Sequence, residues 1–162
     1  RKTGILFTSS IQAESDNPYG RSKKLAEKSI IEWSRVANNT AYIYRLPNIF
    51  GKWSKPNYSS VVATFAYNIS HDLPIDIHDP EHKITLAHVD DVVHCFLSSL
   101  EGSSTKGPDG YYHIDNTTTI SLKEIADILY MFRDNAIDTE LAAPKYFVSK
   151  LLLTYNYFKS LP

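Results

Sequence analysis

The sequence predicts an α/β fold, and two observations carry that prediction. Short runs of apolar, β-branched and aromatic residues, which are typical of strands, alternate along the chain with longer segments whose apolar residues recur at helical spacing. No internal repeat, low-complexity tract or linker interrupts this alternation over the 162 residues, a length typical of one domain. Because alternating strands and helices usually build a mostly parallel sheet covered by helices, we expect that architecture here.

The first strand and the first helix are predicted on either side of a polar turn. Residues 4–7 form an apolar run followed by the polar tripeptide TSS, which predicts a buried strand with a polar tip. Asn17 is a good residue to cap the N-terminus of a helix, and Pro18 suits its first position. The helix is expected to continue to about residue 37, with one face formed by Ser22, Ala26, Ile30, Trp33 and Ala37.

The later elements follow from the same kinds of signal. Pro47 is expected to end the second strand and to begin a loop that contains further glycine and proline. The tetrapeptide SLKE, which starts at Ser121, is a capping box and predicts the start of a helix. Strands are expected at 40–46, 74–78, 84–89 and 111–114, helices at 59–70, 90–100, after the capping box and at 144–159, and a surface loop at 102–110.

Composition excludes several classes of protein. With 43% hydrophobic and 22% charged residues and a formal net charge of −1, the chain lacks the signature of disorder and any electrostatic footprint for nucleic acid or anionic lipid. No apolar run reaches the roughly 18 residues of a membrane span. The single cysteine, Cys95, excludes an internal disulfide framework and a cysteine-built zinc site. We therefore expect a soluble cytoplasmic protein with no nucleic-acid or membrane partner.

The six histidines do not predict a metal site. Four of them lie loosely together in the sequence, without cysteine partners or the spacing of a helical zinc motif: His78, His82, His88 and His94. The neighbouring Asp90 and Asp91 are better explained as acidic charge at a helix N-terminus than as two catalytic carboxylates. No metal ligand is predicted.

Tyr19 and Lys23 are the most informative pair in the sequence. Residues four apart on a helix share a face and lie about 6 Å apart along its axis. A lysine ammonium beside a phenol favours the phenolate, so such a tyrosine can exchange a proton with a carbonyl or an alcohol. Ser10 ends the preceding strand, at the edge where open α/β sheets bind ligands, and its hydroxyl can polarise the same substrate oxygen. A Tyr–Lys pair is also common on a solvated helix face, so the pair by itself predicts little.

Several motifs together resemble the extended short-chain dehydrogenase/reductase family, also called the NAD-dependent epimerase/dehydratase family. They are a strand ending in Ser-Ser, YGRSK on a helix, RLPNIFG after the next strand, HVDDVV, and YHIDN followed by ISLKEIAD. The resemblance covers nearly the whole chain. The segments FTSSIQA, NPYGRSK, YRLPNIFGKW and KPNY are similar to a bacterial subfamily of reductases for capsular and lipopolysaccharide sugars, in which a cupin-like domain follows the reductase domain.

The resemblance implies three catalytic residues. Tyr19 matches the family's acid/base, and Lys23 matches the lysine that activates it and holds the nicotinamide ribose. Ser10 matches the serine or threonine that hydrogen-bonds the reacting carbonyl, with Ser9 as the second choice and as a cofactor-binding residue. Arg45 belongs to the same landmark but is expected to anchor structure rather than to contact a ligand.

The resemblance also implies binding residues after the second strand. Pro47 and Asn48 match the segment that contacts the nicotinamide side and the substrate, respectively. The nucleotide-sugar loop is expected to begin with Lys52, Lys55, Asn57 and Tyr58, and its two lysines suit a pyrophosphate. A substrate-binding portion is expected at 52–90 and 111–162.

The chain departs from the family pattern in three ways. Only nine positions separate Ser10 from Tyr19, no GxxGxxG turn for the cofactor phosphates follows a first strand, and no cupin-like region follows Pro162. By resemblance we expect the chain to be the C-terminal half of a Rossmann-like doubly wound sheet with a small substrate-binding subdomain. We expect this half to be inactive by itself.

The expected function is reduction of a 4-keto group on a nucleotide sugar, UDP-2-acetamido-2,6-dideoxy-hexos-4-ulose, with NADP or NAD as the cofactor. Members of the family commonly pair through helix faces, so a homodimer is expected by resemblance. Two alternatives stay open. One is a nucleotide-sugar epimerase or dehydratase of the same family, and the other is a non-catalytic sugar-binding or assembly remnant.

Overall fold

The computed structural model of the chain describes residues 4–136 and 143–162. Its contacts divide it into two units. The first unit consists of Arg1–Pro47 and Asp91–Asp115. The second consists of Asn48–Asp90 and Asn116–Pro162.

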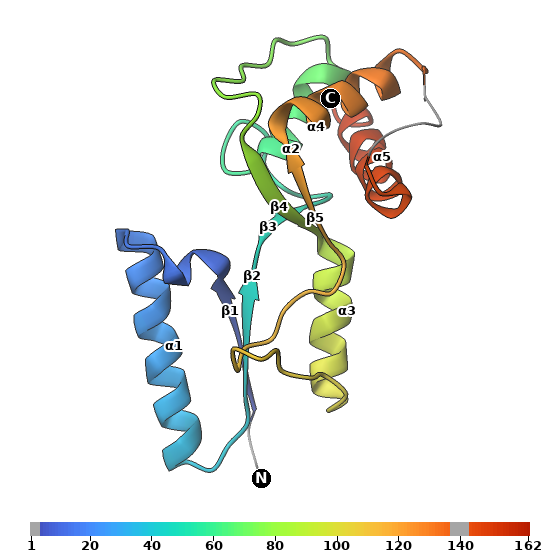
Figure 1. Cartoon of the computed structure of the whole chain (residues 1–162). Coiled ribbons are helices and arrows are strands. Elements are labelled where there is room, and N and C mark those ends of the chain that lie inside the picture. Colours follow the sequence, from blue (N-terminus) through green and yellow to red (C-terminus); the bar gives the residue numbers. More distant parts are fainter. Residues whose placement is uncertain (1–3, 137–142) are drawn as a thin grey trace. The chain divides into compact units, whose positions relative to one another are not determined.

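The first unit is built on two parallel strands that are connected through a helix, as the alternating pattern predicts. The pairing sets Ser9 opposite Arg45, and Ser10 opposite Leu46, at the carboxyl ends of both strands. In Figure 1 the helix runs alongside the strand pair. The elements in chain order are β1 (Ile5–Ser10), the 3-10 turn η1 (Ile11–Glu14), α1 (Pro18–Val36) and β2 (Ala41–Leu46).

Opposite faces of this strand pair are occupied by different elements. Because successive strand residues point to opposite faces, Arg45 faces α1 while its neighbour Tyr44 faces away from it. The Tyr44 hydroxyl donates to the Cys95 carbonyl at 2.8 Å and lies 2.7 Å from the Ser99 hydroxyl. Both partners lie on α3 (Val89–Leu100), so α1 and α3 contact opposite faces of β2.

The start of α1 is as predicted, but its buried face is not. The side chain of Asn17 caps the helix by accepting a hydrogen bond from the Gly20 amide at 2.7 Å. The buried residues of α1 are Gly20 and Glu27, whereas Ser22 and Ala37 of the predicted face are exposed. Ala26, Ile30 and Trp33 of that face are half-buried. The most buried side chain of α1 is that of Glu27, because it meets Ser9 and Arg45 of the strands.

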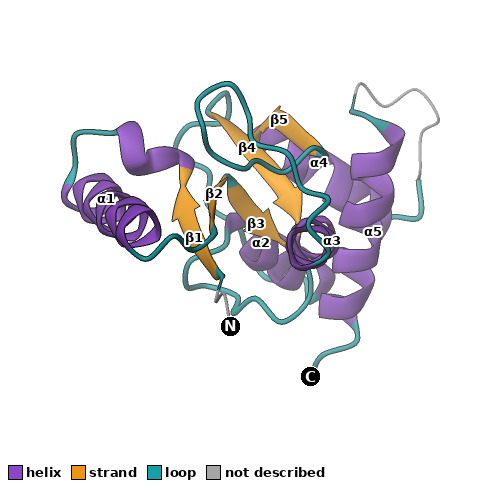
Figure 2. Cartoon of the chain, turned by 90° about the horizontal axis from the view of Figure 1, so that it is seen from below, coloured by secondary structure: helices purple, strands orange, loops and turns teal. Residues whose placement is uncertain are grey.

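The second unit is a three-stranded sheet packed against three helices (Figure 2). The two strands first in sequence pair in parallel, and the third pairs antiparallel to the second. Apolar side chains from strands and helices share one core, which includes Phe50, Leu86, Ile120, Val62, Phe65, Ile125, Leu129 and Leu151. The elements are β3 (Asn48–Phe50), α2 (Val61–Ser70), β4 (Lys83–His88), β5 (Thr117–Ser121), α4 (Leu122–Arg133) and α5 (Lys145–Lys159).

The predicted helices are confirmed in number and place within the described ranges. At the start of α4 the Ser121 hydroxyl accepts from the Glu124 amide at 3.2 Å, and the Glu124 carboxylate accepts from the Ser121 amide at 2.9 Å. These are the two bonds of a capping box. Among residues 4–136 and 143–162, none of the helices combines the length and the apolar character that crossing a membrane requires.

Several strand predictions are wrong. Residues 74–78 form no strand, and the strand expected at 111–114 is a single bridge between Tyr112 and Tyr44. β3 lies where a loop was expected after Pro47, and β5 was not predicted. These short segments become strands only because β4 pairs with both, and pairing over long sequence distances leaves little signal in a segment of three to five residues.

The first strand also differs from its prediction. Its apolar residues Ile5, Leu6 and Phe7 are half-buried, whereas Ser9 and Ser10 at its tip are buried. The carboxyl end of β1 is therefore the better packed end. The predicted substrate-binding portion, 52–90 and 111–162, overlaps the second unit closely, but substrate binding by this unit stays a prediction.

Candidate functional site

Tyr19 and Lys23 lie in the first two turns of α1. The Lys23 ammonium lies 5.6 Å from the centre of the Tyr19 ring and 5.4 Å from that of Phe7. It donates a hydrogen bond to the backbone carbonyl of Thr8 in β1 at 3.0 Å. Tyr19 is 50% exposed, so its phenol is accessible to a ligand. The predicted spacing thus places both groups on one helix face, beside the end of β1.

Ser10 is the last residue of β1 and also the N-cap residue of η1. Its hydroxyl oxygen accepts a hydrogen bond from the Gln12 amide at 3.1 Å. A hydroxyl that accepts in this way keeps its own proton for donation to another group. The geometry of Ser10 is therefore compatible with the predicted contact to a substrate oxygen, which stays a prediction.

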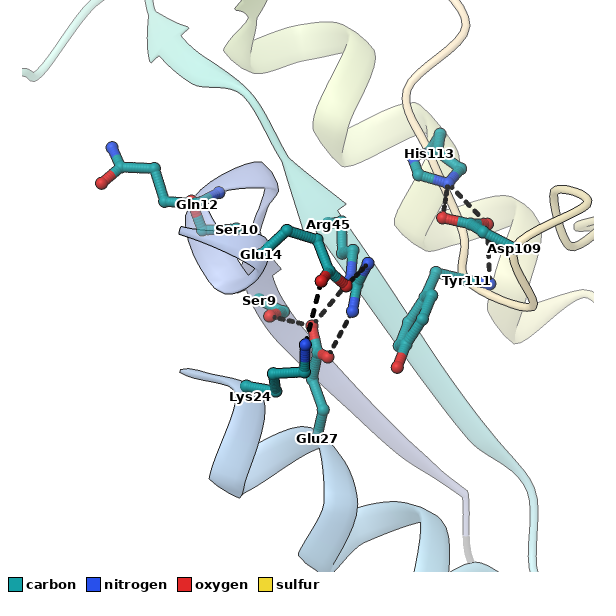
Figure 3. Close-up of polar contacts among 10 residues, drawn as sticks. All are labelled: Ser9, Ser10, Gln12, Glu14, Lys24, Glu27, Arg45, Asp109, Tyr111 and His113. Carbon is teal, nitrogen blue, oxygen red and sulfur yellow. Dashed lines mark hydrogen bonds and ion pairs between the residues drawn. The ribbon is translucent and has the colours of Figure 1, made fainter. Parts of the chain in front are cut away.

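Ser9 is held differently from its neighbour. Its hydroxyl donates to the Glu27 carboxylate of α1 at 2.5 Å, and both residues are buried. The proton of Ser9 is thus engaged inside the first unit, on the face of β1 that packs against α1 (Figure 3). Of the two candidate serines, Ser10 has the geometry that suits a donor to a bound ligand.

A two-bonded ion pair at the strand ends joins Arg45 to Glu27. The Arg45 guanidinium donates to both carboxylate oxygens of Glu27, from Nε at 3.0 Å and from Nη2 at 2.8 Å. Burial raises the pKa of Glu27, but the hydrogen bonds from Arg45 and Ser9 outweigh it and leave this pKa below its ordinary value. The hydrogen bond to Glu27 likewise raises the pKa of Arg45. Arg45 is a structural anchor, as the sequence predicts.

Arg45 also connects to η1 and to the loop before Tyr112. Its Nη1 lies 2.7 Å from Glu14, which pairs on its other oxygen with Lys24 at 2.9 Å. The Tyr111 ring lies against the guanidinium, with its centre 3.6 Å from the Arg45 Cζ atom. Figure 3 shows these groups around the guanidinium. The Glu27–Arg45 network, as we call it, consists of Ser9, Glu14, Lys24, Glu27, Arg45 and Tyr111.

Sequence reasoning missed Glu27, although a signal was present. Glu27 follows Lys23 by four positions, as Lys23 follows Tyr19, so the three residues share one face of α1. A carboxylate on that face must either reach solvent or find a cation. The strand that carries Arg45 supplies the cation, a partner that the sequence does not reveal.

The predicted binding residues after β2 differ in their surroundings. Pro47 directly follows β2 and is half-buried. Asn48 begins β3, is exposed, and donates through its amide to the Thr85 carbonyl of β4 at 3.2 Å. Both positions follow the carboxyl end of β2, and their contacts to a nicotinamide and a substrate stay predictions.

The loop after β3 carries the remaining predicted binding residues, and they are exposed: Lys52, Lys55, Asn57 and Tyr58. The Lys52 ammonium lies 4.6 Å from the centre of the Trp53 ring, and that of Lys55 lies 5.6 Å from the Tyr58 ring. The Asn57 amide pairs with that of Asn68 in both directions, at 3.3 and 3.4 Å. The loop is therefore held at Asn57, while its two cations are accessible.

Asp90, at the start of α3, forms a second charged cluster. Its carboxylate lies 3.2 Å from the Lys150 ammonium and 3.4 Å from Nδ1 of His88. Burial raises the pKa of Asp90, but the hydrogen bond from Lys150 and the nearby side chains of His88 and Lys52 leave this pKa below its ordinary value. Asp90 is thus an ion-pair partner. Within the described residues no group of three or more potential ligands forms a metal site.

Comparison with known proteins gives a consistent result. Residues 4–114 match the model of the NAD dependent epimerase/dehydratase family. UDP-2-acetamido-2,6-beta-L-arabino-hexul-4-ose reductase from Pseudomonas aeruginosa is 44% identical over 135 residues, which cover 83% of this chain and 36% of that protein. dTDP-4-dehydro-6-deoxyglucose reductase from Escherichia coli is 27% identical, covering 77% of this chain and 44% of that protein. The chain spans less than half the length of these curated relatives.

Solved structures resemble the chain as well. The capsular polysaccharide assembling protein CapF from Staphylococcus aureus matches with a TM-score of 0.90 and 40% identity, over 100% of this chain and 46% of that one. UDP-glucose 4-epimerase from Thermus thermophilus, in complex with NAD, matches with a TM-score of 0.73 over 98% of this chain and 65% of that one. At 15% identity, this epimerase shows the shared fold alone. Because the family model matches well over half of its residues, the chain belongs to the NAD dependent epimerase/dehydratase family.

Proposed function

We propose that this chain supplies the proton-donating and sugar-binding residues of an enzyme that reduces a 4-keto group on a nucleotide sugar with NADPH or NADH. The accessible phenol of Tyr19 beside the Lys23 ammonium is the observation that carries this proposal. The 44% identity to a reductase whose name specifies a UDP-linked 4-ulose supports the substrate class. The preferred substrate is UDP-2-acetamido-2,6-dideoxy-hexos-4-ulose.

The residues of the first unit fit the nicotinamide end of such a cofactor. Lys23 uses one N–H on the Thr8 carbonyl, which leaves its other N–H groups for ribose hydroxyls. Pro47 follows β2 at the same edge of the strand pair, next to the end of β1. The glycine-rich turn that cradles cofactor phosphates is not among the 162 residues. A bound reduced nicotinamide supplies the hydride.

The residues at this edge have distinct tasks in the reaction. Hydride addition to the carbonyl carbon leaves negative charge on its oxygen, which the Tyr19 hydroxyl neutralises by donating its proton. The Lys23 ammonium stabilises the phenolate that Tyr19 becomes. The Ser10 hydroxyl donates a hydrogen bond to the same oxygen and orients the carbonyl for attack.

The second unit provides the contacts to the nucleotide sugar in this proposal. Lys52 and Lys55 carry accessible ammonium groups that suit a pyrophosphate. Asn48, Asn57 and Tyr58 add amide and hydroxyl groups for the sugar. The proposal includes a homodimer, which rests on the resemblance to the family. It also includes a cytoplasmic location, because nucleotide sugars and reduced nicotinamides are cytoplasmic metabolites.

The test is a turnover assay of the native gene product with the 4-keto sugar nucleotide and NADPH or NADH. We expect one reduced nicotinamide to be consumed for each sugar reduced. Tyr19→Phe should lower kcat by roughly 10²–10⁴-fold with cofactor affinity unchanged, because it removes the proton donor alone. Lys23→Met should lower both kcat and the affinity for the cofactor. Tyr42→Phe is the control, since this half-buried tyrosine lies near the start of β2, at the end of the strand pair opposite Ser10 and Leu46.

Other results of this assay would assign a different function to the protein. Conversion of the sugar without net consumption of reduced nicotinamide would indicate the epimerase or dehydratase alternative. Binding of the sugar nucleotide with no conversion would indicate a non-catalytic binding module. Full turnover in Tyr19→Phe would overturn the role of that residue in any of these enzymes.

A further inference from the structure

We propose that Glu27 is a positioning residue, which fixes α1 against the ends of β1 and β2 and so holds Tyr19 and Lys23 in place relative to Ser10. The catalytic consequence of this inference rests on the function proposed above. The positioning itself is a property of the first unit and is measurable without turnover.

The contacts of Glu27 tie the helix to both strands at once. Its carboxylate is 1% exposed and accepts three hydrogen bonds, one from Ser9 of β1 and two from Arg45 of β2. Ser9 and Arg45 lie directly opposite each other in the strand pair. One carboxylate therefore sets the distance and the rotation of α1 at the place where both strands end (Figure 3).

The position of Glu27 on the helix transmits this constraint to the predicted catalytic residues. Tyr19, Lys23 and Glu27 follow one another at intervals of four, which places them about 6 Å apart along one face. An α-helix keeps its backbone hydrogen bonds when it slides or rotates, so it moves as a body over two turns. Any displacement of Glu27 against the strands therefore displaces Tyr19 and Lys23 as well.

The remaining members of the Glu27–Arg45 network connect the same anchor to the turn that Ser10 begins. Glu14, the last residue of η1, lies 2.7 Å from Arg45 and 2.9 Å from Lys24 on α1. Ser10 caps η1 through the Gln12 amide. The guanidinium of Arg45 thus contacts both the helix that carries Tyr19 and the turn that carries Ser10.

Stability by itself does not account for this buried pair. Removing a carboxylate and a guanidinium from water is costly, and apolar residues of similar size often stabilise a protein as well or better. Paired parallel N–H···O bonds between Arg and a carboxylate add directional specificity that apolar contacts lack. Directional specificity is what proton transfer requires, because small misplacements of reacting groups slow a reaction strongly.

The test replaces Glu27 by Asp, which keeps the charge that compensates Arg45 but withdraws the carboxylate by one methylene group. Glu32→Asp is the matched control, because Glu32 lies on the same helix with its side chain 64% exposed in a surface pair with Arg35. We would measure thermal stability, kcat, KM and amide hydrogen exchange of the native gene product for the parent and both variants.

We expect Glu27→Asp to stay folded and to exchange amide hydrogens faster across residues 10–20, about tenfold or more. Its kcat should fall about 10- to 100-fold while KM for the sugar changes less than about twofold, since geometry is lost but binding groups are kept. Glu32→Asp should match the parent in every measurement. If Glu27→Asp does not fold, Ser9→Ala removes one of the three bonds and takes its place in the same comparison.

Two results would overturn the inference. Exchange across residues 10–20 equal to that of the parent would show that Glu27 does not hold these segments. Faster exchange with kcat within about twofold of the parent would show that the held geometry does not matter for catalysis. If the parent itself turns over no nucleotide sugar, the proposed function fails, and hydrogen exchange alone decides whether Glu27 positions the helix.

Discussion

The carbonyl oxygen of Gln12 lies 2.3 Å from the position that a β-carbon would occupy at Gly20, and that of Ser15 lies 2.4 Å from it. Both distances are far below van der Waals contact, so a side chain at residue 20 would collide with backbone. Glycine thereby allows η1 to lie directly on the first turn of α1. This contact joins the turn that Ser10 begins to the turn that contains Tyr19.

Replacing Gly20 by Ala should therefore displace one of these turns. We expect a loss of about 1–3 kcal/mol in the free energy of unfolding, as for other overpacked sites, and a lower kcat. Denaturant titration checks the first and initial rates the second. Gly4→Ala is the control, because a β-carbon there meets its nearest neighbours at an ordinary 3.8 Å. Equal stability of Gly20→Ala and the parent would refute the steric argument.

The two adjacent serines should respond differently to the same substitution. Ser10→Ala removes the donor proposed for the substrate oxygen, so kcat should fall about 10²–10³-fold with stability little changed. Ser9→Ala removes one of three hydrogen bonds to Glu27, so stability should fall by about 1 kcal/mol and kcat should fall less than in Ser10→Ala. Rates and unfolding curves of both variants make the comparison. A larger loss of kcat in Ser9→Ala would reverse the assignment of the two serines.

Acid should remove the stabilising contribution of Glu27. Its pKa is lowered in the folded protein by Arg45 and Ser9 against the effect of burial, so the carboxylate stabilises the fold above its unfolded pKa of about 4.5. This contribution is lost as pH falls through the lower, folded pKa. We expect the gap in thermal midpoint between the parent and Glu27→Gln to be constant near neutral pH and to shrink below about pH 4.5. A gap that persists unchanged in acid would contradict the cause given for the shift.

Substitution of the exposed lysines after β3 should weaken sugar-nucleotide binding. Lys52→Met and Lys55→Met each remove an ammonium group proposed to contact pyrophosphate, so KM should rise roughly tenfold with kcat near that of the parent. The effect should diminish at high salt, because exposed charges are screened. Steady-state kinetics at two ionic strengths provide the measurement. Lys28→Met, at an exposed position on α1, should leave KM unchanged.

The helices, the first two strands and the principal candidate residues follow from the sequence because their signals are local. Asn17 and Pro18 mark the start of α1, and the capping box at Ser121 marks that of α4, within a few residues of the actual bounds. The spacing of Tyr19 and Lys23 places both on one helix face by helix geometry alone. The family motifs predict the fold correctly, because each motif is a short local segment and the motifs follow one another in a fixed order along the chain.

The pairing of short strands and the partners of buried charges were decided only in the tertiary structure. β3 and β5 become strands because β4 lies between them, and Glu27 is buried because Arg45 of β2, 18 positions further along the sequence, meets it. Neither the strand pairing nor the Glu27–Arg45 pair leaves a signal in the local sequence. The partners lie far apart along the chain and meet only in the folded structure. The sequence thus determines which residues are candidates for proton transfer, and the tertiary contacts of Ser9, Glu27 and Arg45 determine how the helix that carries Tyr19 and Lys23 meets the strands.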